Sequence, residues 1–202
     1  MTLILGVSGG IGSGKSTVSS YIMDKTKCKC IDADKMSHDM CKAGSKQLME
    51  IVKHFGSEVL TSDGNLNRKY LGDIVFNDPS KLEVLEHFTT DKIVEEIHNE
   101  VKQYKEMEDC KLVLLDAPLL FEKDLYKLCD INLLVTCDLD RKIERLMARD
   151  GFGREQIISR INNQMSDEEK SKFADVILDN SKDLDYLYNQ IDQFLERNNI
   201  EF

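Results

Sequence analysis

The amino-acid sequence predicts an α/β fold in which a parallel sheet carries helices on both faces. Four short apolar runs have the length and composition of buried parallel strands, at residues 3–7, 28–32, 112–116 and 131–136. A weaker fifth run covers residues 175–178. Helical patterns separate these runs, and right-handed crossover helices between parallel strands cover both faces of a sheet.

The first apolar run leads directly into a phosphate-binding motif. Residues 9–17 read GGIGSGKST and satisfy G-x-x-x-x-G-K-S/T, with a helical pattern after them. Glycines permit the close backbone approach by which N–H groups wrap a phosphate, and the next helix adds its N-terminal dipole. The sequence therefore predicts a P-loop NTPase-type sheet that binds a nucleoside triphosphate through Gly12, Ser13, Gly14, Lys15, Ser16 and Thr17.

Two side chains of this loop are expected to act on the phosphates directly. Lys15 would reach the β- and γ-phosphates and neutralise their charge during transfer, and the Ser16 hydroxyl would ligate Mg²⁺. The alternative is a glycine-rich turn with a solvated lysine. The strand before the motif and the helix after it favour the phosphate site.

Composition excludes several classes of protein. The net charge of −10 argues against a non-specific nucleic-acid binder, which needs a basic face. No apolar stretch has the length of a membrane span, and the N-terminal run is too short for a secretory signal. The six cysteines form no C-x-x-C pair, so we do not expect a zinc site. From these observations we expect a reducing, cytoplasmic location, without membrane or nucleic-acid partners.

The length of 202 residues fits one domain with an insertion. We expect the sheet core at residues 1–34, 109–149 and 173–202. Residues 35–108 hold several helices punctuated by glycines, and we interpret them as a substrate-binding insertion beside the nucleotide site. Residues 150–172 are polar, follow an arginine-bearing helix and carry two glycines, which is typical of a lid.

Acidic residues end two of the predicted strands. Asp32 and Asp34 follow the second strand, where side chains line the ligand crevice of an open α/β sheet. One of them is a candidate to orient an attacking hydroxyl and accept its proton, and the other could serve Mg²⁺ through water. Capping of the next helix is an equally good reading of this pair. Asp116 ends a hydrophobic strand in the Walker-B manner and is a weaker candidate for Mg²⁺.

Two further segments are candidates for contact with substrates. Arg141, Arg145 and Arg149 are spaced four apart and share one helix face, which suits phosphate oxygens that develop charge. A solvated face with salt bridges is the alternative for some of them. Residues 118–122 read PLLFE and would form an apolar wall under an acceptor, or else pack in the core.

An ordered set of motifs resembles the dephospho-CoA kinase family. The set runs G-x-S-G-G-I-G-S-G-K-S-T, D-A-D, F-G, D-G-x-L-x-R, P-L-L-F-E, R-L-x-x-R-D-G, R-I-x-x-Q-M and A-D-x-x-x-D-N, from about residue 5 to residue 190. The glycine loop alone is shared by many kinases, whereas the ordered set is specific. Two positions depart from the family pattern: Thr90-Asp91 stands where His-Pro is usual, and Lys182 follows Ser181 where glycine is frequent.

The resemblance implies ATP-dependent phosphorylation of the ribose 3′-hydroxyl of dephospho-CoA, giving CoA and ADP with Mg²⁺ present. It assigns Asp34 as the general base, Arg145 to the transferred phosphate and Arg149 to the lid. It places Asn180 near the adenine. The acceptor region would include Arg68, Phe76, Pro118 and Leu119.

Two rival functions remain. Another small-molecule P-loop kinase would share the core and lid but would not predict the whole motif set. A GTP-binding switch would need N-K-x-D on a strand, and residues 180–183 read NSKD, which has those residue types in the wrong order.

Overall fold

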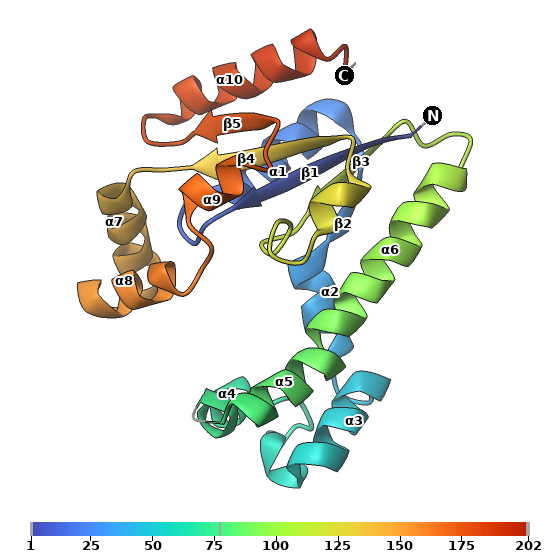
Figure 1. Ribbon diagram of the computed structural model, residues 1–202, viewed down its shortest axis with the longest axis vertical. Coiled ribbons are helices and arrows are strands. Elements are labelled where there is room, and N and C mark those ends of the chain that lie inside the picture. The colour runs from blue at the N-terminus through green and yellow to red at the C-terminus, as the bar shows by residue number, and fades with distance from the viewer. Residues whose placement is uncertain (1, 77, 201–202) are drawn as a thin grey trace. The chain divides into compact units, whose positions relative to one another are not determined.

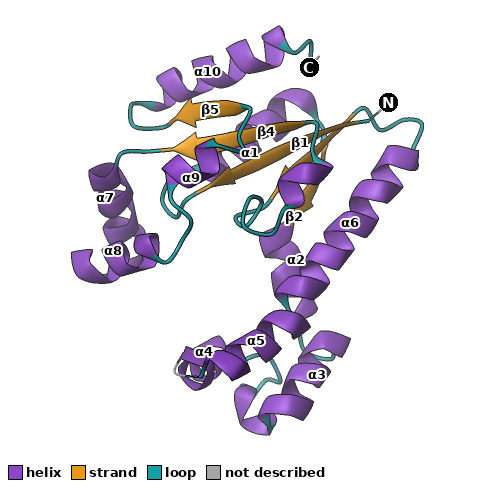
Figure 2. Cartoon of the chain, in the orientation of Figure 1, coloured by secondary structure: helices purple, strands orange, loops and turns teal. Residues whose placement is uncertain are grey.

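The computed structural model describes residues 2–76 and 78–200. Five strands form one sheet in the order β2-β3-β1-β4-β5 (Figures 1 and 2). They are β1 (Leu3–Gly9), β2 (Lys29–Asp32), β3 (Leu112–Asp116), β4 (Ile131–Thr136) and β5 (Val176–Asp179). The pairs β1–β3, β1–β4 and β4–β5 are parallel. The predicted α/β fold with a parallel sheet is confirmed, and the five strands lie within two residues of the apolar runs.

The chain divides into two compact units. One contains the residues up to Ile31 and those from Val101 onward, and the other is Asp32–Glu100. The sequence predicted a helical insertion at 35–108, so the second unit begins slightly earlier and ends earlier than expected. The difference arises because α6 (Thr90–Glu106) is one continuous helix whose last turns pack with the sheet. Thr2 Oγ1, for example, donates to the Tyr104 carbonyl oxygen at 3.1 Å.

One face of the sheet is covered by α1 (Lys15–Thr26) and α10 (Leu184–Arg197). Val18 and Ile22 of α1 and Leu187, Ile191 and Phe194 of α10 are buried against alternate residues of the strands. The 3.6-residue spacing of these side chains matches the apolar stripe that the sequence shows. Leu184 begins the same helix but is exposed, so the stripe starts one turn later than its first leucine.

The other face is covered by the segment after β3, with the 3₁₀ helix η2 (Leu125–Leu128), and by α9 (Asp167–Ser171). Gly6 of β1 allows this segment to approach. A Cβ at Gly6 would lie 2.8 Å from Cys129 Sγ and 3.0 Å from Leu120 Cδ2. Burial raises the pKa of the Cys129 thiol to about 12, so it packs as a neutral side chain.

Two helices project from the end of β4. They are α7 (Leu139–Asp150) and α8 (Arg154–Asn162), which share a small core of Ile143, Leu146 and Ile157. Ile11 of the phosphate loop packs against this core. The glycine loop is therefore held by α7 and α8 as well as by its own strand and helix.

The second unit is helical. It contains α2 (Ala33–Met40), α3 (Lys46–Phe55), the 3₁₀ helix η1 (Ser57–Val59), α4 (Arg68–Phe76), α5 (Pro79–Phe88) and the first turns of α6. Side chains cap several of these helices: Ser45 Oγ accepts from Leu48 N, and Asp78 precedes Pro79 as the cap of α5. Ile51, Val59 and Leu71 are central to its own small core. Within the described residues, no helix combines the length and apolarity needed to span a membrane.

A buried ion pair ties α9 to the segment after β3. The Lys170 side chain is wholly buried, and its Nζ lies 2.8 Å from Glu122 Oε1. The pair anchors α9 to this segment, and the lid at 150–172 stays a prediction.

Glu122→Gln tests this anchor. The substitution leaves the Lys170 ammonium buried without a counter-charge, so we expect it to lower the free energy of unfolding by about 3 kcal/mol. Urea unfolding followed by circular dichroism measures the change. The double variant Glu122→Gln/Lys170→Met should recover much of the loss, and a single variant within about 1 kcal/mol of the parent would contradict the anchor.

Candidate active site

The glycine loop between β1 and α1 has the backbone of a phosphate cradle. Gly12 and Gly14 have φ angles of 78° and 91°, a conformation that side-chain-bearing residues rarely adopt. Gly14 is the N-cap of α1, and its carbonyl oxygen accepts from Thr17 N at 3.0 Å. The N–H groups of the first turn of α1 are thus presented at the end of the loop, as anion binding requires.

The inner side of the loop is tightly packed. A Cβ at Gly14 would lie 2.0 Å from Asn180 Nδ2, and one at Gly9 would lie 2.7 Å from the Val135 carbonyl oxygen. At Gly12, the Leu146 side chain of α7 would be 3.1 Å away. Gly12 and Gly14 are required by close approach and by backbone conformation, and Gly9 by close approach.

Lys15 forms an ion pair with Asp116 at the carboxyl ends of β1 and β3. Val7 and Asp116 are register partners, so the parallel pairing brings the end of β3 beside the loop. The two side chains are only 15% and 10% exposed, which strengthens their interaction. Lys15 and Asp116 therefore reach the same point of the site, as the P-loop and Walker-B patterns predict.

The residues at this point fit a magnesium ion that is shared with a nucleotide. Mg²⁺ takes few protein ligands, typically one or two oxygen groups, and keeps phosphate oxygens and waters. The Ser16 residue is exposed at the start of α1, and the Asp116 carboxylate is beside Lys15. Over residues 2–76 and 78–200 no group of three or more His, Cys, Asp or Glu side chains could hold an ion without such help.

Arg145 and Asn180 form a second cluster at the loop. Asn180 follows β5, is 3% exposed and donates its side-chain amide to the Ser13 carbonyl oxygen at 2.8 Å. Arg145 Nη2 donates to the Asn180 carbonyl oxygen at 3.1 Å. Cys137 Sγ also donates to that oxygen, and burial keeps the pKa of this thiol raised. The predicted phosphate-side arginine is thus attached to the loop through Asn180.

Known proteins resemble this chain over nearly its whole length. The model of the dephospho-CoA kinase family matches residues 3–185. A dephospho-CoA kinase of Fusobacterium nucleatum is 39% identical over 194 residues, 96% of this chain and 97% of the relative.

The chain belongs to the dephospho-CoA kinase family.

Solved structures agree with this assignment. A protein from Thermus thermophilus is 31% identical with a TM-score of 0.79, over 97% of both chains. The dephospho-CoA kinase of Campylobacter jejuni is 25% identical with a TM-score of 0.65, over 99% of this chain and 98% of the relative. The predicted family and kinase class are confirmed, and membership extends over the sheet and the helical unit alike.

Three other arginines, from α7 and α8, make their contacts away from the loop. Arg149 makes a two-pronged contact with the adjacent Asp150, at 2.7 and 2.9 Å, and this hydrogen bonding lowers the pKa of Asp150. Arg154 pairs with Asp140, and the Arg160 guanidinium lies 3.9 Å from the centre of the Phe152 ring. Of the residues at helical spacing, Arg145 alone is recorded against the loop in the described chain. The lid role of Arg149 stays a prediction.

The PLLFE segment was predicted either to pack in the core or to line the acceptor site, and its residues differ in this respect. Leu120 and Phe121 are buried, so they pack in the core. Leu119 is 41% exposed, and the Pro118 carbonyl oxygen accepts from Ser8 Oγ at 3.1 Å. Pro118 and Leu119 therefore remain candidates for contact with an acceptor.

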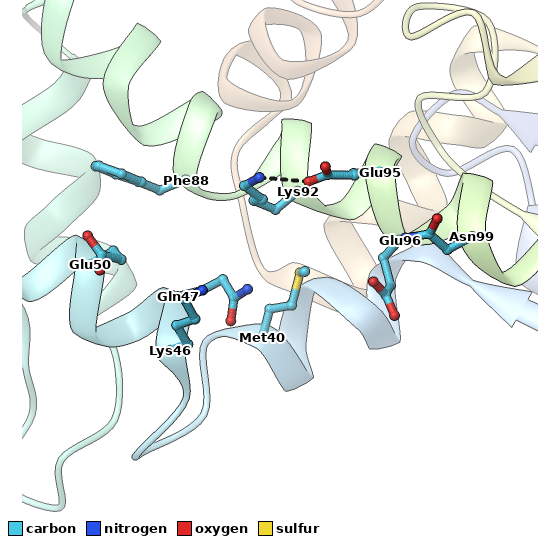
Figure 3. A pocket seen from close by; sticks show the side chains of 9 residues that line it. All are labelled: Met40, Lys46, Gln47, Glu50, Phe88, Lys92, Glu95, Glu96 and Asn99. Atoms are coloured by element: carbon cyan, nitrogen blue, oxygen red, sulfur yellow. Dashed lines mark hydrogen bonds and ion pairs between the residues drawn. The ribbon is translucent and has the colours of Figure 1, made fainter.

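The helical unit contains two cavities. One, of about 300 Å³, has Met40, Phe88 and the Lys92–Glu95 pair in its walls (Figure 3). The other, of about 540 Å³, is lined by His38, Lys42 and Arg68 among others. The second has the cationic lining that an anionic acceptor needs. Phe76 ends α4, and its side chain lies outside what the structure describes.

Asp32 and Asp34 differ in their local roles. Asp32 is the N-cap of α2, and its Oδ1 accepts from Lys35 N at 2.9 Å. Capping is thus the role that the structure records for Asp32. Asp34 lies in the first turn of α2 and is exposed. Its predicted place beside the phosphates stays a prediction.

Gly14→Ala tests the packed loop. The added methyl group meets Asn180 Nδ2 and the backbone strains at positive φ, so we expect ADP affinity to fall more than about tenfold. Isothermal titration with ADP measures the change. Gly44→Ala is the matched control, because Gly44 has a φ of 82° with no atom within 4 Å of its Cβ position. Equal losses in both variants would contradict a role for the Asn180 contact.

Proposed function

We propose that the chain transfers the γ-phosphoryl group of ATP to the ribose 3′-hydroxyl of dephospho-CoA, giving CoA and ADP. The observation that carries the proposal is the family match over nearly the whole chain, on a fold whose glycine loop, Lys15 and Arg145 lie together. In this reaction a bond forms between the 3′-oxygen and the γ-phosphorus, and the bond from the β–γ bridging oxygen to the γ-phosphorus breaks.

The loop and α1 hold the triphosphate in this proposal. Backbone N–H groups of Gly12, Gly14, Lys15 and Ser16, at the loop and the N-terminus of α1, face the phosphate oxygens. Lys15, which pairs with Asp116 in the structure, contacts the β- and γ-phosphates when the nucleotide is bound. Ser16 and Asp116 are the residues that would hold Mg²⁺, which supplies charge neutralisation for the leaving diphosphate.

Arg145 stabilises the charge that develops on the transferred group. Its Nη2 donates to Asn180, which fixes the direction of the guanidinium plane and leaves other N–H groups for phosphate oxygens. A donor held in place before the reaction costs no reorganisation when charge develops. Arg149 and Asn180 are assigned to the nucleotide side of the same site.

Asp34 acts as the general base. Its carboxylate accepts the proton of the 3′-hydroxyl as the oxygen attacks phosphorus. Arg68 and Phe76 of the helical unit, and Pro118 and Leu119 of the sheet unit, are each assigned to acceptor binding. The cavity at Arg68 supports this assignment, because its cationic lining suits the diphosphate of dephospho-CoA. We also propose a cytoplasmic location for the protein, as its composition leads us to expect.

The acceptor is tested by steady-state ADP release. We expect dephospho-CoA to accelerate release, and a panel of nucleosides and nucleotides to leave it near the ATP-only rate. No acceleration by dephospho-CoA, or a larger one by a nucleoside, would favour another small-molecule kinase. A preference for GTP over ATP in nucleotide-dependent thermal shifts would favour a GTP-binding switch.

The base is tested by Asp34→Asn, which removes the proton acceptor with little change in volume. Turnover should fall by at least about 100-fold while ATP still binds. Asp39→Asn is the control, since Asp39 is an exposed residue of the same helix that pairs with Lys42. Asp32→Asn retains a good N-cap, so a larger loss in that variant would transfer the role of base to Asp32.

A further inference from the structure

Three polar side chains that the proposed reaction does not use converge on the first half of the phosphate loop. Gln164 lies between α8 and α9, Lys142 lies on α7, and Asp167 begins α9. A Cβ placed on Gly10 would be 3.4 Å from Asp167 Oδ1 and 3.6 Å from both Gln164 Oε1 and Lys142 Nζ. Side chains from α7, from α9 and from the connection between α8 and α9 thus meet at one backbone position.

Gln164 makes the direct contact with the loop. The Ile11 N–H donates to Gln164 Oε1 at 2.8 Å. Ile11 is two residues after Gly9, where β1 ends, so this bond fixes the backbone before it turns through Gly12 and Gly14. Among the described residues, the Gln164 side chain makes no other hydrogen bond. The amide acceptor is therefore committed to the loop.

Lys142 and Asp167 support this contact from behind. Lys142 is 6% exposed, and its Nζ forms an ion pair with Asp167 Oδ2. An ammonium buried to this extent needs its counter-charge, so the pair joins α7 firmly to the start of α9. All three residues line one cavity of about 370 Å³ with Gly10 and Ile11.

The charges of this cluster identify what it does. Gln164 is neutral, and the positive charge of Lys142 is cancelled by Asp167. The cluster adds no net charge for a triphosphate, and its contact with the loop is made by the Gln164 amide oxygen, which accepts from a backbone N–H. Such an arrangement sets backbone position and leaves phosphate binding to the groups further along the loop.

We propose that Gln164, backed by the Lys142–Asp167 pair, is a positioning residue that sets the shape of the phosphate loop. The inference rests on the proposed function only in that this loop holds the nucleotide. The position of the connection between α8 and α9 is thereby coupled to that of the loop, because the connection cannot shift without losing the hydrogen bond from Ile11 N.

The test compares two glutamine-to-methionine variants. Gln164→Met keeps the volume of the side chain and removes the acceptor, so the Ile11 N–H is left without its partner. Gln156→Met is the matched control, since Gln156 Oε1 also accepts from a backbone N–H, that of Gly153, away from the loop. Each variant is titrated with ADP by calorimetry and melted without nucleotide.

We expect the dissociation constant of ADP to rise about tenfold in Gln164→Met and less than twofold in Gln156→Met. The KM for dephospho-CoA should stay unchanged in both. A Gln164→Met protein that melts earlier but binds ADP within twofold of the parent has lost a structural contact only, and this outcome overturns the proposal.

A second variant covers the case in which Gln164→Met does not fold. Gln164→Asn keeps the amide but withdraws it by one methylene, so ADP affinity should fall in the same direction. Unchanged affinity there also overturns the proposal. ADP binds without a phosphoryl acceptor. The ADP titration therefore tests the role of Gln164 even if dephospho-CoA proves not to be the substrate.

Discussion

The phosphate loop has almost no free volume on its inner side, and the rest of the nucleotide site depends on this constraint. Gly9 faces a β4 carbonyl, Gly12 faces Leu146 of α7, and Gly14 faces the Asn180 amide. Each neighbour comes from a part of the chain more than a hundred residues later. The shape of the loop is therefore set by tertiary packing as much as by its own glycines.

The register of the sheet brings the residues that contact the loop beside it. Gly9 pairs with Val135 in the β1–β4 ladder, and Asn180 N donates to the Thr136 carbonyl oxygen at the end of β4. A change of register by one residue would move Asn180 away from Ser13 and Arg145 away from Asn180. The arginine, the amide and the loop behave as one unit because one parallel sheet holds them all.

The sequence predicted the parts of this site that follow from local pattern. Sequence spacing predicts where the strands end, and it predicts the glycine loop, Lys15 and Asp116. The reason is that parallel strands end at one edge of the sheet. The partner of each arginine was not readable. Helical spacing puts Arg145 and Arg149 on one face, but only tertiary contacts show that Arg149 turns to Asp150 while Arg145 turns to Asn180. Gln164 belongs to the R-I-x-x-Q-M motif, but nothing in the neighbouring sequence predicts its contact with Ile11.

The division of the chain into two units bears on how the proposed reaction is organised. Lys15, Asp116, Arg145 and Asn180 belong to the unit that contains the sheet, so the groups assigned to the donor share one core. Asp34 belongs to the unit 32–100, together with Arg68. The proposed base is thus built into the same unit as acceptor residues, two positions after β2 ends. If Arg68 binds part of the acceptor, one compact unit holds that part and the proposed base, so their geometry is set before transfer.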